Sequence, residues 1–113
     1  MASITIWHNP QCGTSRNALA LLRAAGHDVQ VVQYLKTPPD AATLARVAAA
    51  VGGAKALLRT RGTTAEDRGL PDADDATILA AMLADPILIN RPVVIGPGGI
   101  RLARPAETAL AVL

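Results

Sequence analysis

The sequence predicts an α/β fold, with one domain over residues 1–113 in which a mixed four-stranded sheet is flanked by helices. Three observations predict this class. Short strand-like apolar runs lie near both ends of the chain, helical periodicity fills the stretch between them, and a glycine-rich turn joins the last two strand-like runs. A chain of 113 residues has the ordinary size of one compact domain.

The first third predicts a strand, a helix and a second strand. Apolar residues alternate over Ile4–Trp7, as in a short strand. A helix then follows a loop, with Thr14 or Ser15 as its N-cap and Gly26 at its end. The apolar run Val29–Tyr34 has the length of a buried strand. Strand, helix and strand in so short a segment predict a parallel pair with a right-handed crossover.

The middle of the chain predicts a helical insertion at about residues 38–85, between the second and third strands. Its first helix is expected to have Thr37 as cap and Pro38 at its first position. Spacing and composition divide the insertion into a helix that ends before Gly52, a short helix over 54–61, a polar loop over 62–75 and a helix over 76–84.

The last third returns to strand-like segments, over Ile87–Ile89, Val93–Ile95 and Ile100–Ala103, with a hairpin turn over Gly96–Gly99. Pro105 opens a final helix, whose apolar face is expected to contain Ala106, Ala109, Leu110 and Leu113. The order β-α-β, helical insertion, β-β-α favours a thioredoxin-like sandwich, the fold class that glutaredoxins share.

Composition excludes several functions. Eleven basic and nine acidic residues are scattered along the chain, without the aromatic platform that accompanies nucleic-acid binding. No apolar run approaches the ~18 residues of a membrane span, and the N-terminus lacks a signal peptide pattern. We therefore expect a cytoplasmic protein that binds neither nucleic acid nor membrane. One cysteine and two histidines on different elements predict no disulfide within the chain and no metal site.

The single cysteine, Cys12, lies just before the first predicted helix. Unpaired backbone N–H groups and the positive end of the helix dipole favour an anion there. His8 and Arg16 lie four residues to either side, and a nearby cation lowers a cysteine pKa. The Ser15 hydroxyl could join the N–H groups in holding an oxyanion. The alternative is that Cys12 is only a small buried apolar residue.

The loop from His8 to Arg16, His-Asn-Pro-Gln-Cys-Gly-Thr-Ser-Arg, resembles the active-site loop of the ArsC family of arsenate reductases. Further similar segments follow in the family's order, at residues 34–39, 56–59, 87–93 and 101–105. Together they extend over nearly the whole chain. The loop and the Ile-Leu-Ile-Asn-Arg-Pro-Val segment at 87–93 are the most specific of them.

The resemblance implies a role for each matching residue. Cys12 would be the nucleophile, and Arg59, Arg91 and Arg104 would bind arsenate. His8, Ser15 and Arg16 would lower the thiol pKa and shape the loop, and the Arg91–Pro92 bond would be cis. Because arsenate and a thiolate are both anions, cations are needed before they can react. A forked arginine provides charged hydrogen bonds worth about 1.5–3 kcal/mol each.

A resolving thiol must come from outside the chain, since Ser15 occupies the second position of a Cys-x-x-Cys pair. The resemblance implies no bound cofactor, glutathione as reducing co-substrate and glutaredoxin as partner. Besides a structural relative without turnover, two alternatives remain open. One is a regulator like Spx, which binds RNA polymerase and usually has both cysteines. The other is a relative that acts on another oxyanion or a glutathione-linked substrate, since arginines recognise charge and shape rather than the element.

Overall fold

The computed structural model describes residues 3–113, which divide into two compact units: residues 3–37 with 91–113, and residues 38–90. The predicted insertion, about 38–85, lies inside the second unit. None of the helices among the described residues is long and apolar enough to cross a membrane.

The first unit is built on a mixed four-stranded sheet in the order β2-β1-β3-β4. Its strands are β1 (Ile4–Trp7), β2 (Val29–Val32), β3 (Val93–Gly96) and β4 (Gly99–Leu102). The pair β1–β2 is parallel, whereas β3 runs antiparallel to both β1 and β4. This arrangement confirms the predicted mixed four-stranded sheet and the thioredoxin-like fold class.

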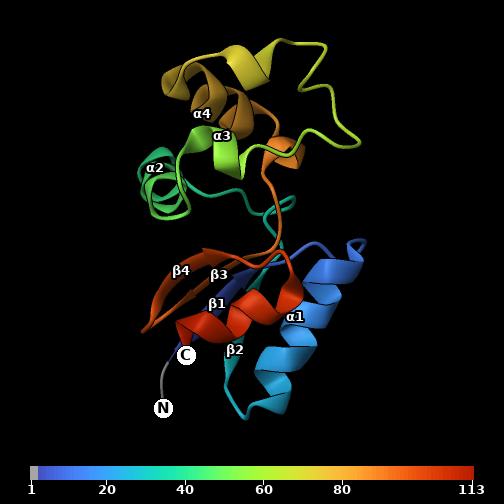
Figure 1. Ribbon diagram of the computed structural model, residues 1–113, viewed down its shortest axis with the longest axis vertical. Helices are drawn as coiled ribbons and strands as arrows, with labels where there is room; N and C mark the ends of the chain where they lie inside the picture. Colours follow the sequence, from blue (N-terminus) through green and yellow to red (C-terminus); the bar gives the residue numbers. More distant parts are fainter. Residues whose placement is uncertain (1–2) are drawn as a thin grey trace. The chain divides into compact units, whose positions relative to one another are not determined.

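Helix α1 (Gly13–Ala24) and the 3₁₀ helix η3 (Ala106–Val112) lie side by side on one face of the sheet (Figure 1). One apolar cluster joins them to the strands, and it is built from Ile4, Ile6, Ala18, Leu19, Leu22, Val94, Ala103, Ala106, Ala109 and Val112. The side chains of this cluster are small and aliphatic, which suits a sequence without phenylalanine. The packed cluster fixes α1, and therefore its N-terminus, against the sheet.

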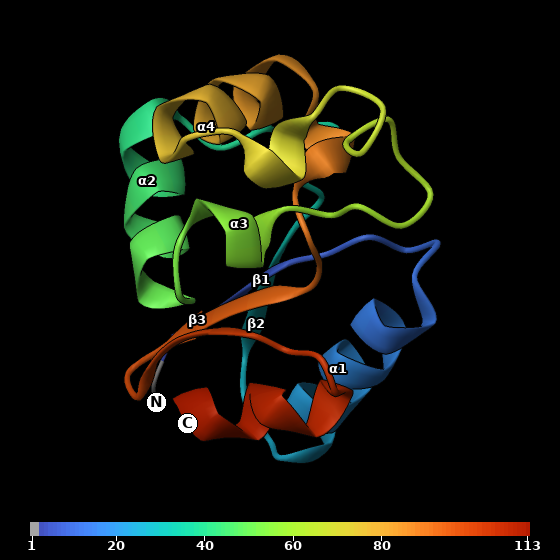
Figure 2. The same ribbon diagram turned by 45° about the horizontal axis from the view of Figure 1, so that its top comes forward.

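The second unit is helical. Helices α2 (Ala41–Ala50), α3 (Ala54–Leu57) and α4 (Asp75–Ala84) pack against one another (Figure 2). The short 3₁₀ helices η1 (Leu70–Asp72) and η2 (Pro86–Leu88) lie before and after α4. A single bridge pairs Leu58 with Ile89.

Two helix starts differ from the prediction. Helix α1 begins at Gly13 with Cys12 as its N-cap, because the Ser15 hydroxyl is engaged elsewhere, as described below. Helix α2 has Asp40 rather than Thr37 as its cap, and the Asp40 carboxylate accepts the Thr43 N–H at 2.7 Å. The reason is that Pro39 disfavours helical backbone at the residue before it.

Three predicted elements are shorter than expected or of another type. The second strand ends at Val32, because the chain turns at Gln33, whose carbonyl accepts two N–H groups from residues 36 and 37. Helix α3 ends at Leu57, because Leu58 is extended to pair with Ile89. The predicted strand Ile87–Ile89 is wrong: Pro86–Leu88 form a 3₁₀ turn, and only Ile89 makes a bridge.

The final helix is a 3₁₀ helix, and its buried face differs from the prediction. With three residues per turn, Ala106, Ala109 and Val112 share one side and are buried. Leu110 and Leu113, which a 3.6-residue period would place on that face, are 40% and 41% exposed.

The hairpin turn between β3 and β4 packs closely against the C-terminal end of this helix. The Gly98 N–H donates to the Val112 carbonyl at 2.8 Å, and a Cβ at Gly96 would lie 2.6 Å from the same oxygen. Glycine is therefore required at position 96 for the close approach of the hairpin to η3.

Candidate active site

Cys12 caps the N-terminus of α1 with extended backbone, at φ −97° and ψ 120°. Its own N–H donates to the Asn9 carbonyl at 3.0 Å, and its carbonyl accepts the Arg16 N–H at 3.0 Å. The side chain is mostly buried, with 9% exposed. The thiol therefore lies at the N-cap position of α1, where an anion is favoured.

The pKa of the Cys12 thiol lies below its ordinary value. Burial raises the pKa, but four groups together outweigh burial: the Ser15 N–H, the charge of Arg91, a hydrogen bond from Arg104 and the Thr14 N–H. Two of these are helix N-terminal amides and two are arginines. The site therefore favours a thiolate, which is the nucleophilic form of cysteine.

Arg104 is the side chain that reaches the sulfur. Its Nη1 lies 3.8 Å from Cys12 Sγ and also donates to the Arg91 carbonyl at 3.0 Å. The chain holds this geometry through the Ala103 N–H, which donates to the Pro92 carbonyl at 2.9 Å. The Arg91 carbonyl thus orients the Arg104 guanidinium that contacts the thiol.

The Arg91–Pro92 peptide bond is cis, as expected. The Arg104–Pro105 bond is also cis, which was not predicted.

A buried hydrogen-bond network joins His8, Asn9 and Ser15, which flank Cys12 in the sequence. The Ser15 hydroxyl lies 2.6 Å from His8 Nδ1 and accepts the Asn9 N–H at 3.0 Å. All three residues are buried, and Ser15 is fully so. The Ser15 oxygen accepts the Asn9 N–H and still carries its own hydrogen, so the hydroxyl can donate to Nδ1 when that nitrogen is unprotonated.

Electrostatics agrees with a neutral His8. Burial lowers the pKa of His8, and the charges of Arg23 and Arg16 lower it further. The ring is therefore uncharged near pH 7 and adds no positive charge beside the thiol. His8 anchors the loop through Ser15. The thiol pKa is lowered by the two backbone amides and the two arginines named above.

Arg16 lies across the loop rather than against the sulfur. Its Nη1 donates to the Pro10 carbonyl at 2.8 Å on the exposed side of the loop. Asn9 closes the same loop from within, since its side-chain oxygen accepts the Gln11 N–H at 3.0 Å. We did not predict this role of Asn9, although Asn-Pro is a known turn-forming pair and was the available signal.

Of the predicted site residues, the first unit brings together Cys12, Arg91 and Arg104, with His8, Ser15 and Arg16 in the supporting loop. Arg59 belongs to the second unit, where its N–H donates to the Leu88 carbonyl at 2.8 Å. Its action on a substrate at Cys12 remains a prediction.

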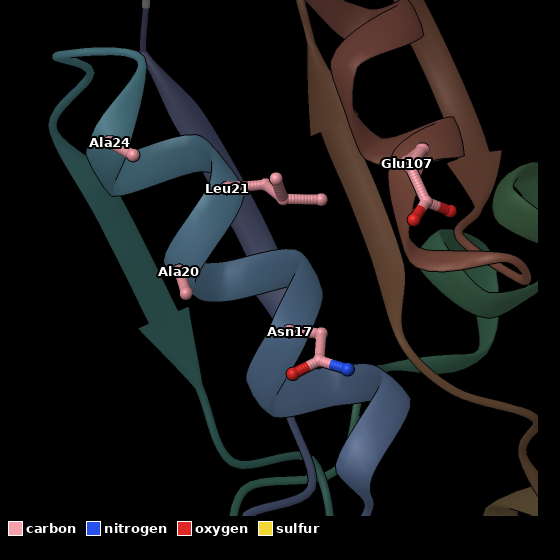
Figure 3. A pocket seen from close by; sticks show the side chains of 5 residues that line it. All are labelled: Asn17, Ala20, Leu21, Ala24 and Glu107. Atoms are coloured by element: carbon pink, nitrogen blue, oxygen red, sulfur yellow. The ribbon is translucent and has the colours of Figure 1, made fainter.

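A separate groove of about 390 Å³ lies between α1 and η3, lined by Asn17, Ala20, Leu21, Ala24 and Glu107. Leu21 points from α1 toward η3, where Glu107 stands (Figure 3). The lining contains no predicted site residue and no nucleophile. Among residues 3–113, no three His, Cys, Asp or Glu side chains are grouped to hold a metal ion.

Removal of the Ser15 hydroxyl should loosen the loop. In Ser15→Ala, the buried Asn9 N–H and His8 ring lose their partner, so we expect the free energy of unfolding to fall by about 1–3 kcal/mol. Thermal or urea unfolding measures this effect. Thr14→Ala changes a half-buried side chain one residue away and should cost less. Equal losses in both variants would contradict the network.

The fold and the site define a class: thioredoxin-like proteins with a cysteine of lowered pKa at a helix N-terminus and arginines beside it. The model of the ArsC family matches residues 7–112. The chain belongs to the ArsC family.

Several arsenate reductases are similar to the chain in sequence or in structure. The chain is 49% identical to an arsenate reductase of Rhizobium meliloti (strain 1021), over 98% of this chain and 81% of that protein. It is 44% identical to an arsenate reductase of Escherichia coli (strain K12), over 100% of this chain and 82% of that protein. Among solved structures, an arsenate reductase from Vibrio cholerae matches with a TM-score of 0.91 and 37% identity, covering 98% of both chains.

Proposed function

We propose that this protein reduces arsenate to arsenite, with Cys12 as the nucleophile and glutathione and glutaredoxin as the source of electrons. The observation that supports the proposal most is the Cys12 thiol itself. It caps a helix, its pKa is lowered, and an arginine lies 3.8 Å away, in a chain 49% identical to an arsenate reductase.

The first step forms a bond between the Cys12 sulfur and arsenic, and one arsenate oxygen leaves as water. Both reactants are anions, so their approach requires positive charge. Arg104 and Arg91 provide it beside the sulfur, since both favour the thiolate. We assign Arg59 to the same oxyanion as a third cation. Charged hydrogen bonds from arginine contribute about 1.5–3 kcal/mol each.

The second step needs an external thiol, because the chain contains one cysteine. The glutathione thiolate attacks the Cys12 sulfur, the sulfur–arsenic bond breaks, and its electron pair remains on arsenic, which leaves as arsenite. The two electrons come from two sulfurs, which end as a Cys12–glutathione disulfide. Glutaredoxin then reduces that disulfide and restores the thiol.

Arsenite formation in the presence of selected reductants tests this sequence. We expect steady turnover when arsenate, glutathione and glutaredoxin are all present, and at most one equivalent of arsenite when glutaredoxin is omitted. Mass spectrometry of the protein from that reaction should show the added mass of one glutathione on Cys12. Equal turnover without any thiol would contradict the external reductant. The absence of arsenite even at high arsenate concentration would instead indicate another oxyanion as substrate.

A further inference from the structure

The turn over residues 59–65 of the second unit contains the third proposed arsenate ligand, Arg59. The backbone at the start of this turn is held by backbone pairing with residues 88 and 89. Leu58 pairs with Ile89, and the Arg59 N–H donates to the Leu88 carbonyl at 2.8 Å. Leu58 and Ile89 are both buried, so the backbone just before the turn is anchored.

The Thr63 side-chain hydroxyl closes the turn together with one backbone bond, from the Thr63 N–H to the Thr60 carbonyl at 3.2 Å. Thr63 Oγ1 donates toward two carbonyls, those of Arg59 at 2.8 Å and Thr60 at 3.0 Å. The same oxygen accepts the N–H of the buried Ala65 at 3.2 Å. Gly62 adopts a positive φ of 75° within the turn, which permits the tight reversal. Thr63 is thus bonded to the backbone before and after itself.

The guanidinium of Arg59 depends on this turn. Its Nε donates to the Arg61 carbonyl at 3.0 Å, and Arg61 lies inside the turn that Thr63 closes. A hydrogen bond at Nε sets the plane of a guanidinium, which is rigid and presents its donors as a fork. A fork that is oriented before binding loses less conformational freedom when an oxyanion binds.

We propose that Thr63 is a positioning residue for Arg59: its hydroxyl holds the turn that orients the Arg59 guanidinium, and it thereby sets the affinity for arsenate. This inference rests on the proposed function, in which Arg59 binds the substrate. In this proposal Thr63 acts through Arg59, and not directly on the substrate or on Cys12. Its loss should therefore weaken binding and leave the chemical step intact.

The variant Thr63→Val keeps the shape of the side chain and removes the hydroxyl. We expect its KM for arsenate to rise about three- to tenfold, with kcat within about twofold of the original protein. Thr63→Ser, which restores the hydroxyl, should return KM to within about twofold. Thr64→Val makes the same change at the exposed neighbouring threonine and should leave both constants unchanged.

A double-variant cycle separates positioning from a general effect on the second unit. In an Arg59→Ala background, Thr63→Val should raise KM no further, because the group that it positions is gone. Titration of arsenate into the corresponding Cys12→Ser proteins, which we expect not to turn over, should give the same pattern in Kd.

Several results would overturn the inference. An unchanged KM in Thr63→Val would do so, as would an increase that persists in the Arg59→Ala background. If Arg59→Ala itself leaves KM and Kd unchanged, the arsenate role of Arg59 fails together with this inference. Arsenite formation that depends on Cys12 would stand in each of these cases, so the two failures can be told apart.

Discussion

Replacement of Cys12 by serine is expected to abolish arsenate reduction, with a loss on the order of 10⁴-fold or more. Serine is a good N-cap residue, so α1 keeps its start and the fold should persist. A serine hydroxyl remains protonated near neutral pH, because the groups around position 12 cannot lower its pKa far enough to give an alkoxide. The sulfur–arsenic bond then cannot form.

Arsenite formation is measured for both proteins with glutathione and glutaredoxin present, together with their thermal unfolding. The variant should unfold within a few degrees of the original protein, which shows that activity is lost through chemistry and not through unfolding. Arsenite formation by Cys12→Ser at the original rate would remove the nucleophile from the mechanism and, with it, the proposed function.

The sequence was sufficient to predict elements whose ends are set by local chemistry. The strand Ile4–Trp7 has the predicted bounds, and Gly26, with a positive φ of 86°, follows α1 as expected. Prediction from the sequence failed where the same residue pattern fits two kinds of helix. Ala106 and Ala109 suit both a 3.6- and a 3.0-residue period, and only the burial of Val112 rather than Leu110 reveals the 3₁₀ helix.

In the site, too, local features could be predicted from the sequence, whereas contacts between distant residues could not. The position of Cys12 before a helix is visible in the sequence, and the amides that lower its pKa are adjacent in the chain. The contact of Arg104 with the Arg91 carbonyl crosses 13 residues. The local pattern predicts the β3–β4 hairpin but not this contact between the residues that flank its two strands. The Ser15 hydroxyl was expected to face an oxyanion or cap the helix, but it bonds to His8, which is anchored at the end of β1.

Arg104 should affect both the thiol and the substrate. Arg104→Met keeps much of the length of the side chain and removes its charge, so the hydrogen bond to Cys12 Sγ is lost. That bond lowers the thiol pKa, so its removal should raise the pKa and shift the pH dependence of iodoacetamide alkylation to higher pH. Less thiolate and one fewer cation for arsenate should reduce kcat/KM roughly ten- to hundredfold near pH 7.

Arg101→Met is the matched control, because Arg101 is exposed on the adjacent strand β4 and its Nη1 donates only locally, to the Ile100 carbonyl at 2.9 Å. That variant should keep the alkylation profile and kcat/KM of the original protein. The two effects of Arg104 can be separated by pH. Above the raised pKa the thiolate is restored, so the kcat/KM that is still missing there reports the interaction of Arg104 with arsenate and not its effect on the thiol. An unchanged alkylation profile in Arg104→Met would show that the amides of α1 and Arg91 suffice to hold the thiolate.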